Sequence, residues 1–143
     1  VMSNPTRALQ VIEELRAIGV GLAIDDFGTG HSSLAYLSRL PVTELKIDRS
    51  FVMDMADEPT ATSIVRTIVD LGRNLELDVI AEGVENDDIA SSLIDLGCHH
   101  AQGFHYSRPL EPRAFETWHA HHDAELAAAH SGATASEQSI AAS

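Results

Sequence analysis

The sequence predicts an α/β fold with parallel strands, and three observations support this prediction. Amphipathic helix patterns alternate with short apolar runs along the chain of 143 residues. The apolar runs show little polar–apolar alternation, as expected of parallel strands that are covered on both faces. A helix lies between successive strand candidates, which indicates right-handed β-α-β crossovers. The length suits one ordinary domain.

The first half of the chain contains clear start and stop signals. Asn4 and Pro5 supply an N-cap and a first-turn proline ahead of a helix whose apolar residues recur at three-residue steps. Gly19 ends this helix, and the apolar run that follows is too short to be another one. Ser32 is a candidate cap for the next helix. The expected elements are a helix over 6–19, a strand over 21–24, a helix over 32–40 and a strand over 43–48.

The second half repeats the pattern. Pro59 precedes a run in which Ile64 and Ile68 fall on one helical face. Two more apolar runs follow, separated by a capped helix that ends at Gly97. The expected elements are a helix over 60–75, a strand within 77–85, a helix over 86–97, a short strand that starts at Cys98 and a helix over 114–130. The small polar residues 131–143 predict a disordered tail.

Composition excludes several function classes. The formal net charge of -13 argues against a DNA-binding or anionic-membrane surface, since either needs a basic patch. The chain contains no apolar run long enough to span a bilayer. Cys98 is the single cysteine and cannot form an internal disulfide, which favours a reducing, cytoplasmic location. An acidic protein can still bind a phosphate substrate through divalent cations.

Polar and charged residues stand at the carboxyl ends of the predicted strands. In parallel α/β folds these ends meet at one face, where functional groups gather. We therefore expect one shared site there. Its candidate residues are Asp25, Asp26, Lys46, Asp48, Glu82, Glu85 and Gln102.

Carboxylates, a lysine and an amide together suit metal-dependent hydrolysis. Hard oxygen ligands favour Mg²⁺, Mn²⁺ or Ca²⁺. Two metals about 3.5–4 Å apart recur in phosphodiester displacement. A bridging carboxylate would make the adjacent Asp25 and Asp26 favourable instead of repulsive. Lys46 would orient the attacking water, and Gln102 would hold a substrate oxygen.

Each segment also has a simpler structural interpretation. Asp25-Asp26 before a glycine is typical of a turn or a helix cap. The 46–48 segment alone suggests a solvated strand end, and 82–85 alone suggests a strand-to-helix turn with an acidic first helical turn. The Asp-Phe-Gly over 26–28 also occurs in protein kinases, but neither a glycine-rich loop nor a catalytic-loop motif accompanies it. The occurrence of all these segments in this order along one chain favours a shared site over the separate structural interpretations.

Four strings then show a family resemblance. IDDFGTGHSSL, LKIDRSFV, VIAEGVE and AQGFHYSRPL occur in this order, and together they resemble the second half of the EAL domain. That family hydrolyses the bacterial second messenger cyclic di-GMP to linear pGpG, on a modified TIM barrel with Mg²⁺ or Mn²⁺. The resemblance implies a partial TIM-like (β/α) barrel of about four strand–helix units over residues 1–118. Residues 119–143 would form the end of a terminal helix and the tail.

The resemblance also implies roles for individual residues. Asp25 and Asp26 match metal ligands of the family, and Glu82 matches a glutamate that ligates metal or relays protons. Lys46 resembles the lysine near the attacking water. Gln102 and Glu85 match the glutamine and glutamate near the metal, water and substrate. Asp48, from its position at a strand end, is a further supporting or substrate-binding candidate. The segment 26–34 resembles a flexible loop that the family links to metal binding and dimerisation.

The sequence departs from the family at its start. The Glu-Ala-Leu strand, an asparagine and a further glutamate would all precede the first residue, so we expect half a barrel that is weakly active at best by itself. The expected partners are cyclic di-GMP, the N-terminal half of the barrel and, as a further option, a second copy of the chain. The alternative function is an inactive EAL module that binds the dinucleotide or a protein.

For the remaining motifs, a structural role is favoured over a binding or catalytic one. His119 and His122 are spaced to bind Zn²⁺ or Ni²⁺, but no complete ligand set accompanies them, which favours exposed histidines. Cys98 is expected to be a small core residue. Phe115 and Trp118 are expected to pack against the protein and not against a base.

Overall fold

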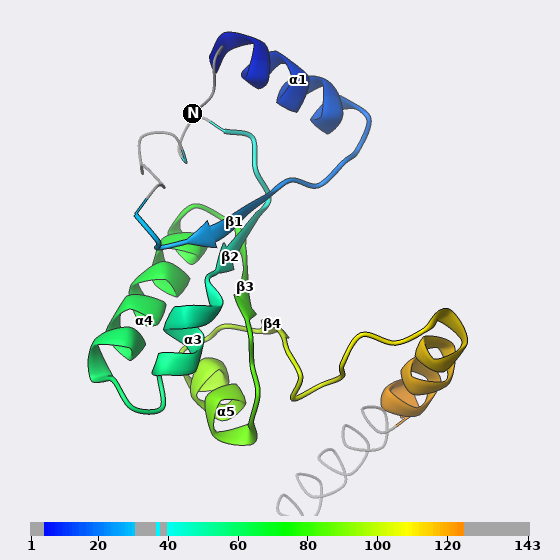
Figure 1. Ribbon diagram of the computed structural model, residues 1–143. Helices are drawn as coiled ribbons and strands as arrows, with labels where there is room; N and C mark the ends of the chain where they lie inside the picture. Colours follow the sequence, from blue (N-terminus) through cyan, green and yellow to red (C-terminus); the bar gives the residue numbers. More distant parts are fainter. Residues whose placement is uncertain (1–4, 31–36, 38–39, 125–143) are drawn as a thin grey trace, which may run out of the picture. The chain divides into compact units, whose positions relative to one another are not determined.

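A computed structural model describes residues 5–30, 37 and 40–124 of the chain. It divides into two compact units, Val1–Tyr106 and Ser107–Ser143. In the first unit, one sheet holds four parallel strands in the order β1-β2-β3-β4 (Figure 1). The strands are β1 (Ala23–Phe27), β2 (Glu44–Ile47), β3 (Asp78–Glu82) and β4 (His100–Gln102). The helices are α1 (Pro5–Ala17), α3 (Arg49–Asp54), α4 (Pro59–Asn74) and α5 (Asp87–Asp95).

The strand order equals the chain order, so each connection steps to the neighbouring strand, as in a (β/α) barrel. The register places Glu44 beside Asp78 and Ile80 beside His100. The predicted parallel α/β fold is therefore confirmed.

Two elements differ from the sequence prediction, and two predicted segments lie wholly or mostly outside the described residues. β1 begins two residues later than expected and includes both aspartates. The short helix α3 was not predicted; Asp48 caps it, with Oδ1 accepting from the Ser50 backbone N–H at 2.9 Å. The helix expected over 32–40 lies mostly outside the described residues, although Leu37 is helical. The tail over 131–143 also lies outside them.

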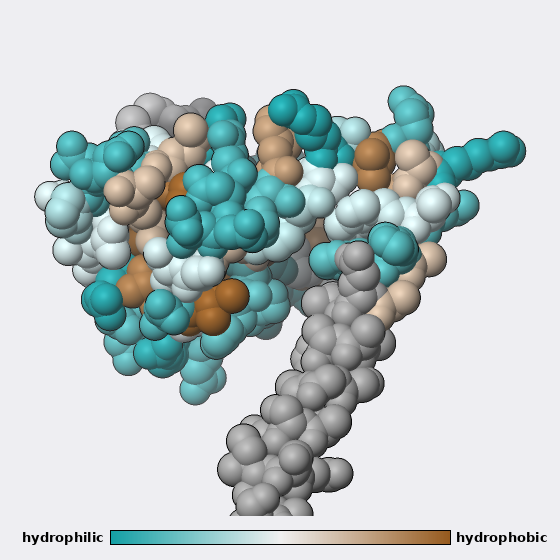
Figure 2. All heavy atoms as spheres, turned by 90° about the horizontal axis from the view of Figure 1, so that it is seen from below, coloured by the Kyte–Doolittle hydropathy of each residue, from teal (hydrophilic) through white to brown (hydrophobic). Residues whose placement is uncertain are grey.

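The core lies on the side of the sheet that α3 and α4 cover. Leu45 and Ile47 of β2 are fully buried there, with Val52 of α3 and Val65 of α4. Lys46, between the two buried β2 residues, points to the opposite face, because side chains alternate along a strand. The visible surface is mostly hydrophilic with small apolar patches (Figure 2).

Gly72 is required where α4 meets β3. A Cβ built on Gly72 would lie 2.1 Å from Val79 Cγ2. Alanine normally stabilises a helix interior by about 1 kcal/mol relative to glycine. We nevertheless expect Gly72→Ala to lower the free energy of unfolding by roughly 1–3 kcal/mol, because the added methyl overpacks the core. Urea denaturation measures this change.

The companion variant is Gly72→Ala combined with Val79→Ala, compared with Val79→Ala alone. Removing the valine methyls makes room for the new one, so the loss caused by Gly72→Ala should shrink in this background. An equal loss in both backgrounds would show that the Gly72–Val79 contact is not the cause.

In the second unit, residues 112–124 are helical, which agrees with the predicted helix as far as the described residues extend. Trp118 stacks on His122 with ring centroids 4.9 Å apart. His119 Nδ1 lies 3.1 Å from Asp123 Oδ2. These histidines thus contact residues of their own helix. Within the described part of the chain, no helix is long and apolar enough to cross a membrane.

Candidate metal centre

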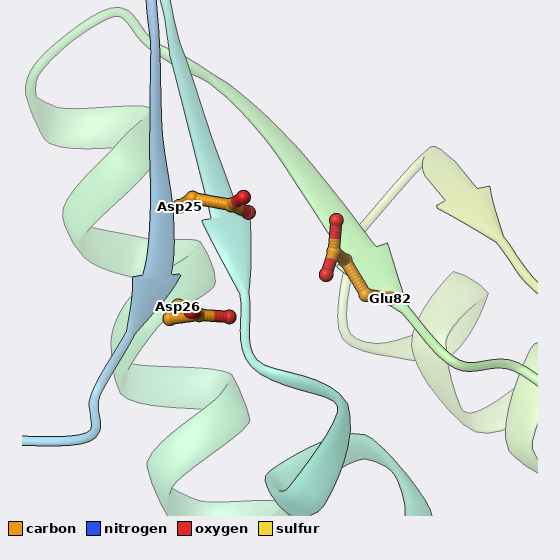
Figure 3. A group of neighbouring side chains, drawn as sticks. All are labelled: Asp25, Asp26 and Glu82. Carbon is orange, nitrogen blue, oxygen red and sulfur yellow. The ribbon is translucent and has the colours of Figure 1, made fainter.

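The end of β1 contains a bulge that explains why two adjacent aspartates serve one site. Neighbouring side chains of a regular strand point to opposite faces. Here the register with β2 shifts between Ile24 and Phe27, and Asp26 has a φ of 50°. Aspartate tolerates this left-handed conformation better than most residues, and a bulge re-aims the side chain. Both carboxylates consequently lie on the side of β1 that faces Glu82 (Figure 3).

Asp25, Asp26 and Glu82, the carboxylate trio, are close enough to share a cation. One oxygen from each lies within 4.8 Å of the other two. Opposite oxygens are about 4.2 Å apart around Mg²⁺ and about 4.6–5.2 Å apart around Ca²⁺, from their usual bond lengths. The trio therefore has the donor type and the proximity of a candidate site for a hard divalent cation. No other three potential ligands of the described residues come this close together.

Lys46 lies between the two strands that carry the trio. Its Nζ donates to Asp25 Oδ1 at 2.9 Å and forms an ion pair with Glu82 Oε1. The hydrogen bonds to Glu82 and Asp25 raise the pKa of Lys46 above its ordinary value. Lys46 is thus a permanent ammonium that offsets part of the trio's negative charge.

Asp26 lies among several other carboxylates, and its pKa is raised. Desolvation raises the pKa of its carboxyl, and the negative charges of Asp25 and Asp48 raise it further. These surroundings disfavour the ionised form of Asp26, and a nearby cation would offset that effect.

Gln102 joins the centre through Glu82. Its Nε2 donates to Glu82 Oε1 at 2.8 Å, from the neighbouring strand β4. Glu82 is only 16% exposed, so these contacts restrict its carboxylate. The structure thus brings together five of the sequence-predicted residues: Asp25, Asp26, Lys46, Glu82 and Gln102.

Asp48 adjoins the centre through Asp26, whereas Glu85 has a different partner. Besides capping α3, Asp48 accepts a hydrogen bond from the Ser50 hydroxyl, and these bonds from Ser50 lower the pKa of Asp48. Glu85 Oε1 accepts from Arg49 Nη2 at 2.7 Å. Neither belongs to the trio. Arg49 was missed by the sequence reasoning; its only signal was its place directly after a strand-end aspartate.

The comparisons with known proteins agree with this geometry. The EAL domain family matches residues 1–109. The bifunctional diguanylate cyclase/cyclic di-GMP phosphodiesterase MucR of Pseudomonas aeruginosa is 50% identical over 109 residues, which cover 76% of this chain and 16% of MucR. The chain thus spans less than a fifth of that relative's length.

Two solved structures share the fold. The PaMucR phosphodiesterase in its c-di-GMP complex has a TM-score of 0.74 and 47% identity, covering 80% of this chain and 46% of that one. The manganese and cyclic di-GMP complex of Klebsiella pneumoniae BlrP1 has a TM-score of 0.69 and 36% identity, covering 75% and 27%. The four parallel strands therefore correspond to part of an EAL TIM barrel. The chain belongs to the EAL domain family, whose members include cyclic di-GMP phosphodiesterases.

Proposed function

We propose that this chain supplies part of the catalytic face of a metal-dependent phosphodiesterase that hydrolyses cyclic di-GMP to linear pGpG. The observation that supports the proposal most strongly is the carboxylate trio with Lys46 at its centre. The names of its relatives supply the substrate: MucR is a cyclic di-GMP phosphodiesterase, and the BlrP1 complex contains cyclic di-GMP.

Asp25, Asp26 and Glu82 would hold Mg²⁺ or Mn²⁺, with Asp25 as the candidate bridging ligand. When bound, such ions lower the pKa of a coordinated water and neutralise charge that builds up on the phosphate oxygens. In the complete barrel, the site would hold two such ions. The trio offers few protein ligands, so water and substrate oxygens would complete the coordination.

Lys46 and Gln102 would act on the water and the substrate. The Lys46 ammonium stays protonated, because two carboxylates accept its hydrogen bonds. It can therefore orient an attacking water or stabilise a phosphate oxygen, but it does not serve as a base. Gln102 would hold Glu82 in place and offer its amide to a substrate oxygen. We propose supporting roles for Asp48 and Glu85 at the edge of the site.

A binding module without catalysis is the second candidate function. A TIM barrel closes with eight strands, and the described residues form four. Asp25 is 64% exposed, so the trio of this sheet lacks the enclosure that strengthens electrostatic catalysis. We expect hydrolysis to require the other strands of the barrel.

The test is a hydrolysis assay with cyclic di-GMP and Mn²⁺, for the chain alone and mixed with an N-terminal EAL half-barrel. Formation of pGpG on mixing supports the proposal. Failure to form pGpG in either sample, with Mn²⁺ binding intact, favours the binding module. Turnover by the chain alone would contradict the requirement for the other strands.

Lys46→Met separates catalysis from metal binding in the same assay. We expect the active mixture to lose at least about 100-fold in turnover, the scale of a positioned catalytic group. Mn²⁺ affinity should stay equal or increase, because the ammonium that competes for Asp25 and Glu82 is gone. Weaker Mn²⁺ binding would show that Lys46 organises the ligands instead.

A further inference from the structure

Arg49 links the carboxyl ends of β2 and β3. It begins α3, with only Asp48 between it and the end of β2, and its guanidinium reaches the turn that follows β3. Nη2 donates to Glu85 Oε1 at 2.7 Å, and Nε lies 3.0 Å from Met53 Sδ within α3. The guanidinium therefore contacts both its own helix and the β3 turn.

The stem of Arg49 lies against the backbone of Gly83, the residue after Glu82. A Cβ built on Gly83 would lie 2.2 Å from Arg49 Cγ, and Gly83 has a φ of 76°. Glycine at this position allows both the close approach and the left-handed backbone. Arg49 consequently touches the chain one residue from a member of the carboxylate trio.

The same turn is also tied to β4. The Val84 N–H donates to the Gln102 carbonyl at 3.1 Å, while the Gln102 side chain donates to Glu82. Movement of the 83–85 turn would therefore displace Glu82 relative to Lys46 on β2.

We propose that Arg49 is a positioning residue: by clamping the 83–85 turn through Glu85, it holds Glu82 within reach of the cation that Asp25 and Asp26 bind. This inference rests on the proposed metal-binding function. It also gives Glu85 a specific task, as the anchor for Arg49 instead of a metal or substrate contact.

Mn²⁺ affinity distinguishes positioning from a simple charge effect, because the two predict opposite signs. As a nearby positive charge alone, Arg49 would repel the ion, and Arg49→Met would tighten binding. As a positioning residue, its loss would weaken binding by about two- to fivefold, the scale of an exposed ion pair. Arg49→Lys, which keeps the charge without the planar fork, should fall between wild type and Arg49→Met.

The double variant Arg49→Met/Glu85→Gln sharpens the test. Under the proposal it binds Mn²⁺ as weakly as Arg49→Met, because both changes break the same link. If charge alone mattered, the two changes would cancel and wild-type affinity would return. The matched control is Arg73→Met, which removes an exposed arginine paired with Asp70 on α4 and should leave Mn²⁺ affinity unchanged. Equal or tighter binding by Arg49→Met would overturn the proposal.

Amide hydrogen exchange without metal tests the clamp independently of the proposed function. We expect Arg49→Met, but not Arg73→Met, to speed exchange in a peptide spanning 82–86 by about two- to fivefold. Unchanged exchange there would overturn the role of Arg49 even if the trio binds Mn²⁺. A wild-type chain that shows no Mn²⁺ binding, with the exchange difference intact, would instead contradict the metal site.

Discussion

Asp26→Asn is expected to stabilise the metal-free chain and to weaken its Mn²⁺ binding strongly. The raised pKa of Asp26 means that the folded chain holds this proton more tightly than the unfolded chain does. Its stabilising contribution is therefore complete below the ordinary value of 3.8 and is lost as pH rises through the folded value. At neutral pH the ionised carboxylate opposes folding, and asparagine removes that opposition.

The two effects are measured on the same samples. The melting temperature of Asp26→Asn should exceed that of wild type at pH 7 without metal, and the difference should vanish in acid. Mn²⁺ affinity should fall at least about 100-fold, since removal of an outer-shell partner alone costs 10- to 100-fold. Asp57→Asn, an equal change of charge at an exposed turn, is the control for both. A variant that binds Mn²⁺ normally would remove Asp26 from the ligand set.

Leu93→Ala is expected to cause the largest loss of stability. Leu93 of α5 is 1% exposed and belongs to the core cluster. Removing its side chain costs the transfer free energy of the lost methyl groups and leaves a cavity, so we expect the free energy of unfolding to fall by about 2–5 kcal/mol. Small domains have free energies of unfolding of about 5–15 kcal/mol, so this loss would be a large fraction of the total stability.

The control is the same kind of substitution at the next residue of the helix. Ile94 is 63% exposed, and Ile94→Ala should change stability by no more than about 0.5 kcal/mol. Urea unfolding followed by circular dichroism compares the two. Equal losses would mean that α5 does not pack on the sheet through Leu93.

The sequence was sufficient to predict the parallel sheet and the face on which polar residues gather. Apolar runs separated by amphipathic helices favour parallel pairing, and parallel pairing brings the carboxyl ends of the strands together. For this reason Lys46, Glu82 and Gln102 meet in the structure as the strand pattern indicated.

The bulge and the clamp could not be predicted in the same way. A period-two strand places Asp25 and Asp26 on opposite faces, and only the register shift against β2 brings both to Glu82. Likewise, Arg49 and Glu85 are distant in the sequence, and their contact depends on how the ends of β2 and β3 align. Periodicity describes single elements, whereas these features arise from the pairing between elements.

The most direct test of the carboxylate trio is Mn²⁺-induced broadening of the amide signals in an NMR titration of the chain. With 22 acidic residues in the sequence, diffuse binding is the competing explanation. At substoichiometric Mn²⁺ we predict that the amides of Asp25, Asp26 and Glu82 broaden first. Uniform broadening across the acidic residues, or earlier loss at Asp87 and Asp88 of α5, would contradict a metal centre at the end of β1 and β3.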